Sequence, residues 1–238
     1  MMRDLFTRSG RRRRTARRLP DGPLRRYLET PPPASSTPLA DLRLLAVDVE
    51  TTGLDPRRHR VLSVGLVPVD GDRIDLGGAR SMILRDDHAD EAEGVGQSAT
   101  LHGITDDTVA TGVGVGAVLD QVFAALTGRV LVAHYSRIET EFLGSLCSTA
   151  HDVRPPFVPV DTLELHRRVL GGGVDMGFAP EASPDELRLW RARRRYGLPR
   201  YRAHDALIDA LACAELYLAQ TAELRDRGVT TLRDLGTA

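Results

Sequence analysis

One apolar stretch, LRLLAVDVE at residues 42–50, constrains the fold of this chain more than any other. Its nearly continuous hydrophobic run is typical of a strand buried on both faces in the middle of a sheet. The run nevertheless carries Asp48 and Glu50. Side chains two residues apart on a strand share one face, with Cα atoms about 6.5–7 Å apart. Because paired carboxylates repel each other and resist burial, this pattern favours a functional site over ordinary surface acids.

The segments after this strand predict an α/β protein. Residues 60–84 contain two further strands with a turn near Asp70–Gly71, and residues 129–134 and 157–160 form short buried strands. Helical patterns cover residues 115–128, 138–147, 161–173, 182–197 and 203–226, with Asp161 as the N-cap of the third. This order predicts a mixed central sheet flanked by helices in one domain, residues 41–222.

The two ends of the chain differ from this domain. Residues 1–40 begin with an arginine-rich stretch and continue into ETPPPASSTPLA, whose proline and serine content is typical of a linker. We therefore expect a flexible N-terminal arm, either simply solvated or attracting nucleic-acid phosphates. Residues 223–238 are expected to form a short C-terminal tail.

Composition excludes several classes of protein. All 32 basic side chains are arginine, and without lysine the chain has neither a Walker A phosphate loop nor a Schiff-base lysine. Cys147 and Cys213 are far apart in apolar helical patterns, so we expect buried thiols and a reducing, cytoplasmic location. No apolar run approaches the about 18 residues of a membrane span, so no membrane partner is expected.

Two more polar clusters interrupt apolar patterns. In AHDALIDALA, Asp209 lies on an apolar helical stripe, where a carboxylate needs a compensating partner. His204 lies five residues earlier, and five helical residues turn about 500°, so we expect His204 just before the helix with Asp205 as its N-cap. From there its imidazole could act as a general base. In LVAHYSRIETEFL, Glu139 or Glu141 could supply another carboxylate, and spacing does not distinguish them.

Carboxylates gathered in this way suit divalent cations. Mg²⁺ prefers oxygen ligands and usually keeps water or substrate phosphate in its coordination shell. Two such ions about 3.5–4 Å apart hold both the attacking and the leaving oxygen of a phosphodiester. The pattern therefore indicates metal-dependent phosphodiester chemistry that needs about four carboxylates.

Together these segments resemble the DnaQ-like 3′–5′ exonucleases, the DEDD group with a histidine in its third motif (DEDDh). DVETTGL at residues 48–54 is similar to the first motif, LVAHYSRIETEFL at 131–143 to the second, and HDALIDA at 204–210 to the third. VLSVGLVPV, LHGIT and VDTLEL are also similar to family sequences. The resemblance covers residues 42–219, and the order and spacing of the first and third motifs carry most of it.

The resemblance implies a ribonuclease H-like fold and a set of site residues. Asp48, Glu50, Glu139 and Asp209 would hold two Mg²⁺ or Mn²⁺ ions, and His204 would deprotonate the attacking water. The residues expected to bind substrate are Thr51, Thr52, Gly53, Leu54, His134, Arg137 and Arg202. Among these, Leu54 would wedge against the terminal base.

The second motif departs from the family pattern at three positions. Glu139 stands where aspartate is usual, Ile138 where phenylalanine is usual, and Tyr135 where asparagine is usual. Glutamate keeps the charge and the oxygen ligands but adds a methylene, so either the helix shifts or activity is reduced. The VDTLEL segment contains a further carboxylate, Asp161, which its N-cap position explains without a metal.

We therefore expect a hydrolase that removes nucleoside monophosphates from the 3′ end of DNA, with single strands preferred. The alternatives are an exoribonuclease that trims RNA ends and a degenerate module that binds 3′ ends without cutting them. The expected partner is a nucleic acid with a free 3′ end. A DNA polymerase or another replication or repair protein is a second candidate partner, as in proofreading. Residues after about Arg225 do not resemble a polymerase-binding tail, which favours a stand-alone nuclease.

Overall fold

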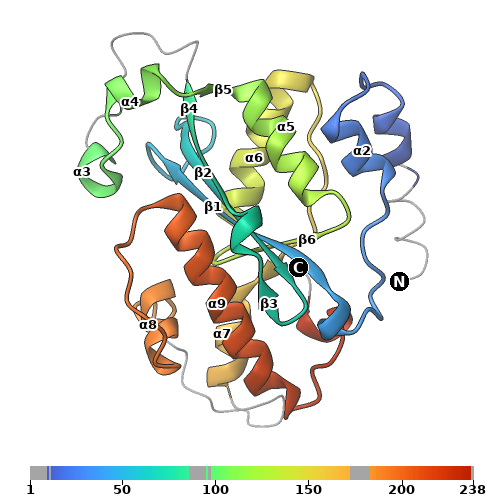
Figure 1. Ribbon diagram of the computed structural model, residues 1–238, viewed down its shortest axis with the longest axis vertical. Helices are drawn as coiled ribbons and strands as arrows, with labels where there is room; N and C mark the ends of the chain where they lie inside the picture. Colours follow the sequence, from blue (N-terminus) through green and yellow to red (C-terminus); the bar gives the residue numbers. More distant parts are fainter. Residues whose placement is uncertain (1–9, 11, 86–94, 96–97, 172–182, 237–238) are drawn as a thin grey trace.

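The computed structural model describes residues 10, 12–85, 95, 98–171 and 183–236 (Figure 1). Within these residues, a seven-stranded mixed sheet forms the centre. Its order is β5 (Val113–Gly114), β4 (Arg80–Arg85), β2 (Val61–Asp70), β1 (Arg43–Thr51), β6 (Val130–Ala133) and β7 (Val160–Asp161), and β3 (Arg73–Ile74) pairs with β2 outside this order. β2 runs antiparallel to β1 and β4, whereas β6 runs parallel to β1 and β7. The predicted α/β fold with a mixed, helix-flanked sheet is confirmed.

Helices cover both faces of the sheet (Figure 1). One face carries α2 (Pro23–Glu29), α5 (Val115–Leu126) and α6 (Arg137–His151). The opposite face carries α7 (Thr162–Leu170) and α9 (Ala206–Arg225), and α8 (Leu189–Arg195) packs on α9. Shorter helices include η1 (Leu39–Asp41), η2 (Leu76–Gly78), α3 (Ala99–His102), α4 (Asp106–Ala110) and η4 (Leu232–Leu235).

β1 is the central strand predicted for residues 42–50, and its side chains alternate between the two apolar layers. Leu45 and Val47 face the layer that includes α5 and α6, whereas Leu44 and Ala46 face the layer that includes α7 and α9. By the same alternation, Asp48 continues the row of Leu44 and Ala46 toward the carboxyl end of the strand. The acids of β1 therefore lie on the sheet face that α9 covers.

A glycine allows α9 to approach the sheet closely. Gly65 on β2 pairs with Asp48 on β1, so its missing side chain would stand on the same face. A Cβ atom at this position would lie 2.0 Å from the carbonyl oxygen of Ala206 and 2.4 Å from the backbone nitrogen of Leu207. Only glycine fits between β2 and the first turn of α9, and this contact brings the start of α9 to the carboxylates of β1.

Residues 12–40 pack against the domain instead of extending from it as a flexible arm. Tyr27 is buried, its ring lies 5.2 Å from that of Phe123 on α5, and its hydroxyl donates to the carbonyl of Pro156. Farther along, the backbone of Leu39 donates to Thr230, and Leu232 donates back to Thr37. The arginine and proline content of this segment led us to expect a flexible arm. A few buried apolar side chains are nevertheless enough to anchor it to the domain.

The end of the described chain is anchored in the same way. Leu224, Val229, Leu232 and Leu235 are buried in the apolar layer of α9. Residues 223–236 therefore complete the core on this face and do not form a separate tail.

Two predicted elements are shorter than expected. The strand predicted at residues 157–160 is reduced to β7, since Pro155, Pro156 and Pro159 have no N–H to give to a ladder. The helix predicted at 182–197 begins only at Leu189, because Ser183 and Glu186 form a hydrogen-bonded turn before it. Both differences are local and leave the order of elements as predicted.

No helix in the described part of the chain is both long enough and apolar enough to span a membrane.

The packing of α9 on β2 predicts that Gly65→Ala lowers the free energy of unfolding by about 2 kcal/mol, because an added methyl group in a filled contact forces the backbone apart. Urea unfolding would measure this. Gly116→Ala on α5 is the matched control, since a Cβ there meets nothing within 4 Å and alanine favours the helix. An equal loss in both variants would contradict the proposed role of the close contact.

Candidate active site

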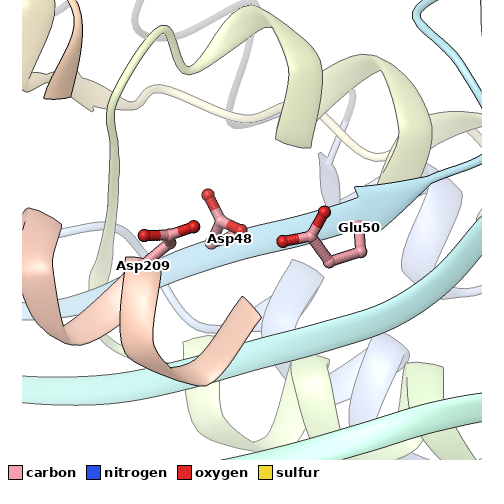
Figure 2. A group of neighbouring side chains, drawn as sticks. All are labelled: Asp48, Glu50 and Asp209. Carbon is pink, nitrogen blue, oxygen red and sulfur yellow. The ribbon is translucent and has the colours of Figure 1, made fainter. Parts of the chain in front are cut away.

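Three carboxylates meet at the carboxyl end of β1. Asp48 and Glu50 come from β1 and Asp209 from the first turn of α9, and one oxygen of each lies within 4.8 Å of the others. Figure 2 shows the three side chains directed toward one shared space between the strand and the helix. The first turn of a helix favours negative charge, which partly compensates the position of Asp209.

Glu139 lies close to this group, whereas Glu141 does not join it. β6 runs parallel to β1, so α6, which follows β6, begins at the same edge of the sheet. Glu139 in its first turn is 3 % exposed, and its Oε2 atom has no hydrogen-bond partner among the described residues. Its charge is, after burial, the largest influence that raises the pKa of Asp48. Glu141 pairs with Arg137 at 2.8 Å on the outer side of the helix.

The site is electrostatically unfavourable as it stands. Burial, followed by the charges of neighbouring carboxylates, raises the pKa of Asp48 well above its usual range and that of Glu50 to about 7. Burial also raises the pKa of Glu139 to about 8 and shifts the pKa of Asp209 upward. The charges that act on Asp48 and Glu50 all come from other carboxylates. A cation among these oxygens would relieve both the repulsion and the desolvation.

His204 lies just before α9, as predicted. Asp205 is the N-cap residue and accepts from the backbone nitrogens of Leu207 and Ile208. The backbone of His204 is left-handed, with φ of 67°, and its N–H donates to Oδ2 of Asp209 at 2.8 Å. Among residues other than glycine, histidine adopts this backbone more often than most, and here the bond to Asp209 helps to hold it. The imidazole is thereby tied through the backbone to one of the acids.

A second histidine, His102 in the LHGIT segment, lies near His204. The backbone N–H of Ile104 donates to Nδ1 of His102, so the neutral ring carries its proton on Nε2. Nε2 is buried without a partner among the described residues, and the pKa of His102 is lowered by burial and then by the charge of His204. The sequence pattern singled out LHGIT without assigning this histidine to the site.

The residues that follow Glu50 form a braced turn. The hydroxyl of Thr51 donates to the carbonyl of Gly53, and the backbone of Thr52 donates to Arg60 across the turn. A Cβ atom on Gly53 would lie 2.4 Å from the ring of His59, so an added side chain here would displace that ring. The side chain of Leu54, four residues after Glu50 in the sequence, is 77 % exposed on this turn.

The structure gives weaker support for substrate binding by the other three predicted residues. His134 uses both ring nitrogens, at 2.9 Å from the hydroxyl of Thr162 and 2.8 Å from the carbonyl of Leu187. Burial lowers the pKa of His134 to about 4. His134 therefore has no ring nitrogen free for substrate. Arg137 is exposed but paired with Glu141, and Arg202 is exposed on the loop before His204.

Asp161 holds the second motif in place and is not available as a ligand. Its carboxylate accepts from the backbone nitrogens of Tyr135, Ser136 and Leu163 and from the hydroxyl of Ser136. It thereby caps α7, as predicted, and also fixes the left-handed Tyr135 just before α6. These bonds set the direction in which α6 begins and hence the place of Glu139.

The arrangement offers hard oxygen ligands to a divalent cation and an imidazole beside them. The unpartnered Oε2 of Glu139 and the raised pKa values of the acids are the marks of a site that protons or a metal must neutralise. The residues therefore fit a divalent metal ion. Glu139, which stands where the family has aspartate, lies outside this group of three, but its charge still acts on Asp48.

Similarity to known proteins agrees with this geometry. A family model described as RNase_T, exonuclease, matches residues 45–217. The DNA polymerase III subunit epsilon of Treponema pallidum is 27 % identical over 177 residues, covering 74 % of this chain and 75 % of the relative. A DNA polymerase III subunit epsilon-like protein of Rhodobacter capsulatus is 30 % identical over 200 residues, covering 83 % of this chain but only 26 % of the relative.

Solved structures share the fold at low sequence identity. The nuclease domain of 3′hExo, a DEDDh family member bound to rAMP, superposes with a TM-score of 0.60 at 16 % identity, covering 76 % of this chain and 92 % of that one. Escherichia coli exonuclease I in complex with a dT13 oligonucleotide gives a TM-score of 0.59 at 16 % identity, covering 79 % of this chain and 43 % of that one. The match of the family model, the order of motifs and the clustered acids lead to one conclusion: the chain belongs to the RNase_T exonuclease family, as a DnaQ-like nuclease of the DEDDh type.

Proposed function

We propose that this protein is a 3′–5′ exonuclease that uses two divalent ions, Mg²⁺ or Mn²⁺, to remove nucleoside monophosphates from single-stranded DNA. The observation that carries the proposal is the convergence of Asp48, Glu50 and Asp209 within 4.8 Å, close to the buried Glu139, whose Oε2 has no hydrogen-bond partner in the described part of the chain. Divalent ions bound there would neutralise the scissile phosphate and the charge that develops on its oxygens. Asp48, Glu50, Glu139 and Asp209 are the residues that would hold them.

The remaining residues orient the substrate and move one proton. His204 takes the proton of the attacking water on a ring nitrogen. Its backbone N–H donates to Asp209, which anchors this residue at the start of α9, next to the acids. Leu54, exposed on its braced turn, packs against the base of the terminal nucleotide. Thr51, Thr52 and the backbone at Gly53 line the approach to Glu50. Catalysis would come mainly from positioning and charge neutralisation.

The similarity to DNA polymerase III proteins and to a nuclease solved with a DNA oligonucleotide supports single-stranded DNA as the proposed substrate. One relative is a DNA polymerase III subunit epsilon and another is named as epsilon-like, and one protein of this fold was solved with a dT13 oligonucleotide. Another was solved with rAMP, so RNA is the competing substrate. The chain spans only about a quarter of the Rhodobacter relative, so the activities and partners of that protein do not carry over directly. Association of this chain with a DNA polymerase is therefore a proposal.

The test is a degradation assay on 5′-labelled DNA and RNA oligonucleotides of the same sequence, with Mg²⁺, Mn²⁺ or EDTA. We expect stepwise shortening from the 3′ end, faster for DNA, with nucleoside monophosphate products and no reaction in EDTA. Faster loss of RNA would identify an exoribonuclease. Binding of 3′ ends without cleavage in any metal would identify a non-catalytic module and overturn the proposal.

His204→Ala should lower the single-turnover rate by about 10²–10⁴-fold, because proton transfer by a positioned side chain contributes that much. Metal affinity, measured by calorimetry, should stay within about twofold, since His204 contributes no ligand in this scheme. Asp48→Asn should instead abolish both cleavage and tight metal binding. Full turnover by Asp48→Asn would exclude the mechanism.

Glu139→Gln should stabilise the metal-free protein at alkaline pH. The ordinary pKa of a glutamate carboxyl is 4.5, and burial in the fold raises the pKa of Glu139 to about 8. Between these values the unfolded chain binds fewer protons, so the free energy of unfolding of the parent falls as pH rises. In EDTA at pH 8–9 we expect Glu139→Gln to melt about 5 °C higher, as about 2 kcal/mol would give in a protein of this size.

The order should reverse when a divalent ion saturates the parent, because ligand binding stabilises the folded state that binds it better. Thermal melts from pH 5 to 9, with EDTA and with Mn²⁺, would measure both effects. Glu141→Gln is the matched control on the same helix, since that carboxylate pairs with Arg137 near the surface. A Glu139→Gln protein less stable than the parent at every pH in EDTA would contradict the assignment.

A further inference from the structure

A buried arginine on α8 lies outside the metal site and joins its own helix to two other segments. Arg193 is 4 % exposed. Its guanidinium donates to the carbonyl of Ala212 at 2.6 Å, to the carbonyl of Pro199 at 2.9 Å and to Oε2 of Glu215 at 2.7 Å. α8, α9 and the loop between them are therefore held by one planar cation.

Tyr201 closes the same cluster from the outer side. Its ring lies under the guanidinium, with 4.9 Å from Cζ of Arg193 to the ring centroid, and its hydroxyl donates to Oε1 of Glu215 at 2.9 Å. Each oxygen of Glu215 thus receives one bond, from Arg193 or from Tyr201. We call Arg193, Glu215 and Tyr201 the loop clamp.

The loop clamp grips the chain just before the proposed general base. Pro199 and Tyr201 precede His204 by five and three residues, and the backbone of His204 is bonded to Asp209. The loop is therefore fixed to α9 at both ends, at Glu215 in the middle of the helix and at Asp209 in its first turn. A short loop held at both ends has few accessible conformations. This restraint helps to maintain the left-handed backbone of His204.

We propose that Arg193 is a positioning residue for the reaction, which acts by fixing the loop that carries His204. A purely structural contact between α8 and α9 would not need a buried ion pair, because apolar side chains fill such a place at equal or lower cost. Three bonds from one planar fork, two to α9 and one to the loop, define a geometry that apolar contacts do not. The inference rests on the proposed role of His204 as the general base.

The experiment is a double-mutant cycle of Arg193→Lys and His204→Ala in the full-length protein, on 5′-labelled oligothymidylate with Mn²⁺. Lysine keeps the charge but loses the fork. We expect Arg193→Lys to lower kcat about 10–100-fold, the cost of a displaced catalytic group, while KM and Mn²⁺ affinity stay within about twofold. In the His204→Ala background, Arg193→Lys should cost less than about twofold, because the group that it positions is gone.

Two further variants keep the test interpretable. Tyr201→Phe removes only the bond to Glu215 and should produce a smaller loss of kcat in the same direction. Arg195→Lys is the matched control, since Arg195 also joins α8 to α9, through Glu223, and forms no hydrogen bond or ion pair with the loop among the residues that the structure describes. An equal cost of Arg193→Lys in both backgrounds, or an equal loss in Arg195→Lys, would overturn the proposal.

Hydrogen exchange of residues 199–205 tests the loop clamp without any catalysis. We expect Arg193→Lys to speed exchange there by about tenfold or more, as for loss of a local restraint, and to leave the middle of α9 unchanged. Unchanged exchange in the loop would overturn the proposal even if the enzyme were slower. If the parent does not cleave DNA, or His204→Ala cleaves as fast as the parent, the proposed function fails, and exchange still decides whether Arg193 fixes the loop.

Discussion

The contact between Gly65 on β2 and the first turn of α9 is the constraint on which the site depends. A strand in the middle of a sheet can present two carboxylates on one face. A third carboxylate, on the helix that covers this face, reaches them only if the helix packs closely against the sheet. The absence of a side chain at Gly65 lets the backbone of Ala206 and Leu207 rest on the strand opposite Asp48. Asp209, in the same turn, is then carried to Asp48 and Glu50.

The second half of the site is built around Asp161. Its carboxylate is saturated by hydrogen bonds to the loop before α6 and to the start of α7, so it orders the second motif without serving as a ligand. Glu139 is thereby buried with one oxygen that has no partner among the described residues, and its charge raises the pKa of Asp48 beyond the effect of burial. Like charges held together in a desolvated place oppose folding, and a divalent ion is the simplest compensation.

Site residues could be placed from the sequence where their positions depend only on the regular geometry of a single strand or helix. The alternation along β1 is enough to put Asp48 and Glu50 on one face, and the turn angle of a helix is enough to place His204 before α9 with Asp205 as the cap. Prediction from the sequence failed where the outcome depended on distant partners. Residues 12–40 were expected to form a flexible arm, but Tyr27 packs against Phe123. His134 was expected to bind substrate, but its ring nitrogens are bonded to Thr162 and Leu187.

The amino-acid sequence by itself determined the class of the fold, the central strand with its two acids, and the family to which the three motifs belong, because strand and helix periodicity are properties of consecutive residues. The motif resemblance pointed to Glu139, but only the tertiary structure buries Glu139 and leaves Glu141 paired with Arg137 near the surface, since this depends on the direction in which α6 leaves β6. The tertiary structure also revealed the cluster of Arg193, Glu215 and Tyr201. Nothing local marks one arginine among 32 as buried; that follows only when α8 and α9 pack together.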